Sequence, residues 1–68
     1  MNQDIARGRW KQVRGQVREW WGKLTDDDLD KIAGKSEKLI GKLQVKYGYT
    51  RKQAKMEIEK RVAELEVE

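Results

Sequence analysis

Residues 20–31 read WWGKLTDDDLDK, and this stretch decides the fold because it contains the start signal of a helix. Thr25 is a suitable N-cap residue, and Asp28 in the third helical position approximates the acidic partner of a capping box. Leu24 comes just before the cap and Leu29 occupies the fourth helical position, which is the spacing of a hydrophobic staple. The stretch therefore predicts a turn followed by a capped helix.

The same device occurs again at residues 46–55, which read KYGYTRKQAK. Here Thr50 is the expected cap and Gln53 its partner in the box. Gly22 and Gly48 precede the two caps and are placed to end the preceding helices, because glycine tolerates the left-handed conformation common there. We interpret the two helix starts as a repeated structural device and not as a binding site.

Glycines recur seven residues apart in two sets, at Gly8, Gly15 and Gly22 and at Gly34, Gly41 and Gly48. Segment 8–22 also aligns with segment 34–48, with similar residues between the glycines. This pattern predicts an internal pseudo-repeat within one domain spanning residues 1–68. Gly8 and Gly15 fall inside a helical pattern, where glycine is unfavourable. Close approach of another helix or local looseness would explain them.

Apolar residues recur at spacings of three and four, which predicts helices over about 4–21, 26–33, 35–47 and 51–65. The boundary between the second and third helices depends only on Gly34 and Ser36. The expected fold is all-α, with two helix–turn–helix units that bury their apolar stripes together. The expected core consists of Trp10, Val13, Val17, Trp21, Leu24, Leu29, Leu39, Leu43, Tyr47, Ile58 and Val62.

The composition excludes several kinds of chemistry. The 68 residues include no Cys and no His, which removes disulfides, thiolate nucleophiles, the usual general base and the commonest transition-metal ligand. Charged residues make up 41% of the chain and hydrophobic ones 37%, and no stretch resembles a membrane span or a signal peptide. We expect a soluble cytoplasmic monomer without a cofactor or metal and without membrane insertion.

Several short motifs resemble those of one known family. They are Trp10-x-Gln12-x-x-Gly15, Trp21-Gly22-x-Leu24-Thr25-Asp26-Asp27-Asp28, Gly34, Gly41-Lys42-x-Gln44 and Tyr47-Gly48. In this order they resemble the CsbD-like family of small bacterial general stress response proteins, from Gly8 to about Ala54. The resemblance implies two orthogonally packed helical hairpins, similar to the SAM-domain arrangement, and expression under stress. It implies no catalytic or binding residue.

Positive charge is concentrated in the first segment. Residues 1–24 contain six cationic and two acidic side chains. The net charge of this segment, +4, therefore equals the net charge of the whole chain. On a helix, four of these cations fall in one strip beside the apolar stripe: Arg7, Lys11, Arg14 and Arg18. Such a ridge is either the solvated flank of an amphipathic helix, which is the commoner case, or a non-specific contact to phosphates.

Trp20 lies at the edge of the apolar stripe, and its counterpart in the second copy is Lys46. We expect it to be partly exposed, either covering the rim of the core or contacting a partner. Rim packing is the commoner explanation, because single exposed apolar residues are normal.

The run of aspartates invites comparison with a calcium loop. Asp26, Asp28 and Asp30 alternate, but the sixth position of such a loop requires glycine and here is Lys31. Carboxylates are also favoured at a helix N-terminus by the macrodipole. We therefore interpret these aspartates as capping and surface residues.

Two functions follow from these observations. The first, based on the expression under stress that the family resemblance implies, is a small non-enzymatic stress-response protein that binds or protects other macromolecules. The second is a weak non-specific nucleic-acid-associated protein that uses the basic face of the first helix. Any partner is thus a protein or a nucleic acid. An enzyme is disfavoured, because only Asp, Glu, Lys or Tyr chemistry remains and the surface is too small for a deep pocket.

Overall fold

The computed structural model describes residue 5 and residues 7–66, without the side chains of Arg7 and Glu66. This part of the chain contains four helices and no strand: α1 (Arg7–Trp20), α2 (Asp26–Ile32), α3 (Ser36–Tyr47) and α4 (Arg51–Glu66). The all-α class is therefore confirmed. The expected start of the first helix at residue 4 lies outside the described residues.

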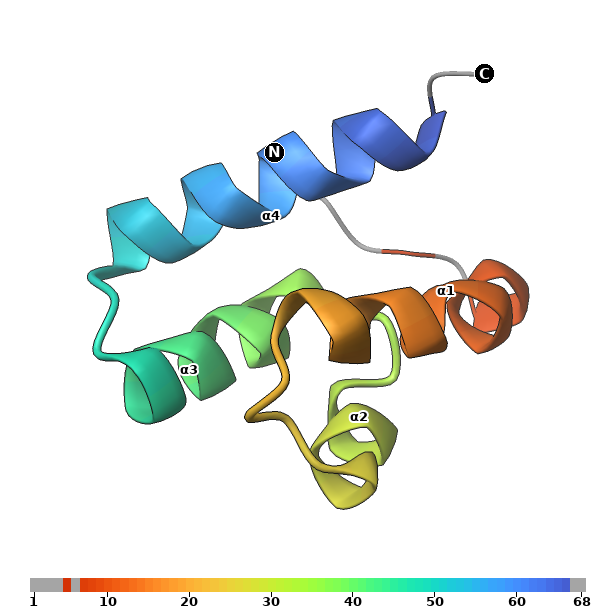
Figure 1. Cartoon of the computed structure of the whole chain (residues 1–68), viewed down its shortest axis with the longest axis horizontal. Coiled ribbons are helices and arrows are strands. Elements are labelled where there is room, and N and C mark those ends of the chain that lie inside the picture. Colours follow the sequence, from red (N-terminus) through yellow and green to blue (C-terminus); the bar gives the residue numbers. More distant parts are fainter. Residues whose placement is uncertain (1–4, 6, 67–68) are drawn as a thin grey trace.

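Helix α3 is central to the arrangement, because it packs against both α2 and α4. In Figure 1, α3 and α4 run in opposite directions on either side of a short connection, while α2 is seen almost end-on below α1. The packing of the helices as two orthogonal hairpins stays a prediction, and so does the internal pseudo-repeat. None of the helices described is long and apolar enough to cross a membrane.

The buried side chains form one cluster to which all four helices contribute. It comprises Trp10, Val13, Val17, Trp21, Leu24, Leu29, Ile32, Leu39, Ile40, Leu43, Ala54 and Ile58. Ile32 and Ile40 were absent from the expected core, although both are almost completely buried. Tyr47 and Val62 were expected in the core and are instead half-buried at its margin. Tyr47 lies at this margin with its hydroxyl accepting a hydrogen bond from the exposed backbone N–H of Lys23 (3.0 Å).

Both capping boxes are present. The hydroxyl of Thr25 accepts from the N–H of Asp28 (3.1 Å), and the carboxylate of Asp28 accepts from the N–H of Thr25 (3.0 Å). The same reciprocal pair joins Thr50 and Gln53, at 3.0 and 2.9 Å. Each box satisfies two donors that a helix start would otherwise leave without partners.

The helix ends differ in part from expectation. Gly48 caps the end of α3 in the left-handed conformation (φ 72°), as expected. The same conformation was expected at Gly22, and this expectation is wrong, because the φ of Gly22 is not positive. Helix α1 ends at Trp20, and a tight turn follows in which the N–H of Leu24 donates to the carbonyl of Trp21 (3.0 Å). This turn allows Trp21 and Leu24 to be buried together. Helix α2 ends at Ile32 and is capped by Ala33, an alanine in the left-handed conformation (φ 48°).

Gly34 is required by a close approach of the N-terminal segment. Its carbonyl accepts from the N–H of Ile5 (2.7 Å), and its φ of 85° lies in the region that favours glycine. A Cβ atom at this position would lie in direct conflict with the carbonyl oxygen of Ile5. At Gly8, Gly15 and Gly41 an added Cβ meets nothing within 4 Å, so packing within the described chain does not require these glycines.

Two glycine substitutions should have opposite effects on stability. We expect Gly34→Ala to lower the free energy of unfolding by about 2 kcal/mol or more, because alanine combines an unfavourable φ with a steric clash. Gly15→Ala should raise it by roughly 0.5–1 kcal/mol, because helix propensity improves and the space is open. Urea unfolding followed by Trp fluorescence measures both, and equal effects of the two substitutions would contradict the assigned roles.

Candidate binding surfaces

The basic ridge of α1 is largely turned towards α2. A guanidinium nitrogen of Arg14 lies 2.8 Å from a carboxylate oxygen of Asp30, and a second one contacts the carbonyl of Asp26 at 3.4 Å. Arg18 forms an ion pair with the carboxylate of Asp26 (2.5 Å). Both ion pairs join α1 to α2, the next helix along the chain. Two of the four ridge cations therefore already have acidic partners within the fold.

The remaining ridge residues differ. Lys11 is exposed and forms no ion pair with any described residue, and the side chain of Arg7 lies outside the described part. Trp20 is half-buried, packs edge-to-face on Trp21 (centroids 5.7 Å apart) and lies under the guanidinium of Arg61 from α4 (5.9 Å). These contacts place Trp20 at the rim of the core. Of the residues expected to contact a partner, Arg14, Arg18 and Trp20 therefore have contacts within the fold, while Lys11 is exposed.

Asp28 is the most strongly held charge of the described chain. Its side chain is only 8% exposed and lies 3.0 Å from the ammonium of Lys42 and 2.9 Å from that of Lys46, both on α3. The pKa of Asp28 is held well below its usual range, mainly by the hydrogen bond from the N–H of Thr25. The ammonium groups of Lys46 and Lys42 are the next largest causes. Burial acts in the opposite direction but is outweighed.

The other aspartates of α2 have comparable partners. Asp27 pairs with Lys31 one turn later (3.4 Å), and Asp26 and Asp30 pair with the α1 arginines. Each carboxylate of α2 is thus balanced by a cation. Within the described part of the chain, no group of three or more acidic residues is arranged to hold a metal ion.

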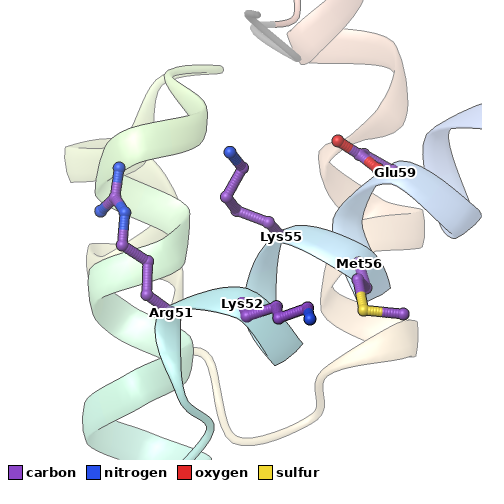
Figure 2. A pocket seen from close by; sticks show the side chains of 5 residues that line it. All are labelled: Arg51, Lys52, Lys55, Met56 and Glu59. Carbon is purple, nitrogen blue, oxygen red and sulfur yellow. The ribbon is translucent and has the colours of Figure 1, made fainter.

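Two shallow hollows lie on the outer surface, each with basic residues along its edge. One, of about 500 Å³, lies on α4 and is shown in Figure 2; its lining residues are Arg51, Lys52, Lys55, Met56 and Glu59. The other is of similar volume and lies between α2 and α3, lined by Lys31, Ile32, Lys38, Gly41, Lys42 and Val45. Val45 and Met56 are the large hydrophobic residues that the described surface exposes most. Each of these exposed side chains therefore lies among cations.

Sequence reasoning missed both hollows. Residues 25–50 and 51–68 each contain equal numbers of acidic and basic side chains, so their net charge conceals a local excess. The available signal was the spacing of the cations, because Lys52, Lys55 and Met56 fall on one side of a helix. Lys38, Lys52 and Lys55 form no ion pair with any described residue.

Comparison with known proteins identifies the family of this chain. The sequence profile of the CsbD-like family matches residues 4–56, which is most of the chain. The chain belongs to the CsbD-like family. CsbD-like relatives include the UPF0337 protein YjbJ of Escherichia coli (strain K12), 55% identical over 58 residues that cover 85% of this chain and 84% of that protein. YjbJ of Salmonella typhi is 53% identical over 85% of this chain and 83% of that protein.

A third CsbD-like relative comes from another genus. It is a UPF0337 protein of Pseudomonas aeruginosa, 48% identical over 58 residues, which cover 85% of this chain and 89% of that protein. The similarity therefore extends over nearly the full length of each chain.

Replacing Asp28 should weaken the fold more than replacing its neighbour. We expect Asp28→Asn to lower the melting temperature clearly, because Lys42 and Lys46 would lose the carboxylate that they share. Asp27→Asn is the matched control, since Asp27 is exposed and forms a single surface ion pair. Thermal unfolding followed by circular dichroism compares the two, and a control that lost as much stability would refute the special role of Asp28.

The contribution of Asp28 should also depend on pH in one direction. Because folding lowers the pKa of Asp28, its stabilisation is complete above the unfolded pKa of about 3.9 and is lost as the pH falls through the lower folded pKa. The stability difference between the wild type and Asp28→Asn should therefore be constant near neutral pH and shrink below about pH 4. Urea titrations over this range measure it, and a difference that grew on acidification would have the wrong sign.

Proposed function

We propose that this CsbD-like protein is a small non-enzymatic stress-response protein of the cytoplasm, which acts as a monomer by binding or protecting other macromolecules. The observation that carries the proposal is the location of its unpaired cations. Lys38, Lys52 and Lys55 have no acidic partner among the described residues and line the two hollows beside the most exposed hydrophobic side chains. Such mixed surfaces favour contacts with large anionic molecules.

The arrangement of the carboxylates supports a role without catalysis. All four aspartates of α2 are paired with cations, and the chain has no His or Cys to serve as base or nucleophile. Both hollows are shallow and lie on the outer surface, in contrast to the concave pockets that bury a substrate. The expression under stress that the family resemblance implies agrees with a binding or protective role.

An alternative proposal is weak, non-specific association with nucleic acid through the basic face of α1. Its support is the excess of positive charge in residues 1–24, together with the exposed side chain of Lys11, which forms no ion pair with any described residue. The ion pairs of Arg14 and Arg18 with α2 reduce the charge that this face can offer.

Protection can be tested on a heat-labile reporter enzyme whose aggregation is followed by light scattering. We expect a molar excess of the protein to delay aggregation, and the triple variant Lys38→Ser/Lys52→Ser/Lys55→Ser to lose most of this effect. The matched control is Arg9→Ser/Lys11→Ser/Lys60→Ser, which has the same net charge but leaves both hollows intact. No delay by the wild type, or equal losses in the two variants, would count against the proposal.

A further inference from the structure

Two helices of this chain begin with the same cap but with opposite charges. After Thr25, the first turn of α2 contains Asp26, Asp27 and Asp28, which suit the positive N-terminal end of the helix dipole. After Thr50, α4 begins with Arg51 and Lys52, and its first turn contains no acidic residue. Lys55 adds a third cation one turn further on. The start of α4 is therefore electrostatically unfavourable within its own helix.

The fold compensates only one of these three cations. A nitrogen of Arg51 lies 2.8 and 2.7 Å from the two carboxylate oxygens of Glu37 on α3. Lys52 and Lys55 have no such partner in the described part of the chain, and Glu59, although it lines the same hollow, is not paired with either. Two positive charges are thus left without an acidic partner among the described residues, and the charge of Lys52 lies in the first turn, where it opposes the helix dipole.

Figure 2 shows these side chains around the α4 hollow, with Lys52 and Lys55 projecting from α4 and Met56 beside them. Met56 is 59% exposed. The backbone N–H groups of Thr50 and Gln53 are already occupied by the capping box. Lys52 and Lys55 are the cations of this hollow that have no acidic partner among the described residues, so an anion at this surface would be contacted mainly by these two side chains.

We propose that the α4 hollow, through Lys52 and Lys55, is a contact surface for the phosphate backbone of double-stranded nucleic acid. This inference rests on the proposed binding role, selects one class of partner and moves the contact from α1 to α4. Charges that weaken the helix on which they lie are expected where an external partner neutralises them. Lysine ammonium groups contact phosphates as point charges and release counterions from the duplex on binding.

Apart from Glu59, whose carboxylate opposes any anion, the composition of the hollow favours this partner over alternatives. No aromatic ring lines it, so the base stacking by which single strands are bound is not available here. Met56 is its only hydrophobic lining residue, which is too little apolar surface for insertion into a membrane interface or for the core of a protein interface. What remains is a sequence-independent electrostatic contact, which is weak and strongly dependent on salt.

The test measures binding and stability on the same variants of the full chain. The probe is a fluorescently labelled random-sequence DNA duplex, followed by anisotropy from 20 to about 200 mM salt. For the wild type we expect measurable binding at low salt, and for Lys52→Glu/Lys55→Glu a loss of about tenfold or more, with the log–log salt slope reduced by about 2. The melting temperature of this variant should rise by a few degrees, because glutamates suit the start of α4.

Arg9→Glu/Lys11→Glu is the matched control, because it changes the net charge equally but on α1. Weaker binding together with higher stability in the α4 variant, and nearly unchanged binding in the control, would support the inference. Equal losses in both variants, loss only in the control, or no binding by the wild type at 20 mM salt would overturn it. Preferential binding of anionic vesicles or of a polyglutamate peptide over the duplex would also overturn it. The protection assay is read independently, so failure of either proposal leaves the other result interpretable.

Discussion

The carboxylate of Asp28 is the interaction on which the arrangement of the helices depends. It accepts a hydrogen bond from the backbone of Thr25, which fixes the start of α2, and it binds two lysines of α3. A local helix signal and a contact between helices are therefore combined in one side chain. The carboxylate of Asp28 is only 8% exposed, and removing its charge would leave two partly buried ammonium groups without their shared acidic partner.

The neighbouring aspartates extend this role along α2. They bind Arg14 and Arg18 of α1, so a seven-residue helix connects α1 on one side with α3 on the other. A helix of this length has little stability alone, and its position is set by the burial of Leu29 and Ile32 together with these ion pairs. The exposed pairs contribute little to stability individually, but they give two cations of α1 acidic partners within the fold.

Local signals in the sequence predicted local structure well. Both capping boxes are present where Thr25 and Thr50 were expected to form them, and Gly48 adopts the left-handed conformation expected of it. Each of these features involves residues at most three or four positions apart, so the spacing alone determines which residues can contact each other. The all-α class follows from the same short-range periodicity.

The features that the sequence could not predict depend on contacts between distant residues. The partners of Arg14 and Arg18 are 16 and 8 positions away, and which helix faces them is decided by packing of the core. Ala33 adopts a left-handed conformation that propensity disfavours, next to the hydrogen bond between Gly34 and Ile5. The turn after Trp20 likewise follows from the burial of Trp21 and Leu24 and not from Gly22. Tertiary packing overrode the local preference in both places.

The two copies of the capping device divide stability and surface chemistry between them. In α2 the acidic residues of the first turn are favoured by the helix dipole, and they form ion pairs within the fold. In α4 the same cap supports a first turn whose charges oppose the dipole and face outward. The cap of Thr50 and Gln53 and the pair between Arg51 and Glu37 are enough to keep that helix start formed. Because Lys52 and Lys55 form no ion pair with any described residue, their charge is available for contacts with another molecule.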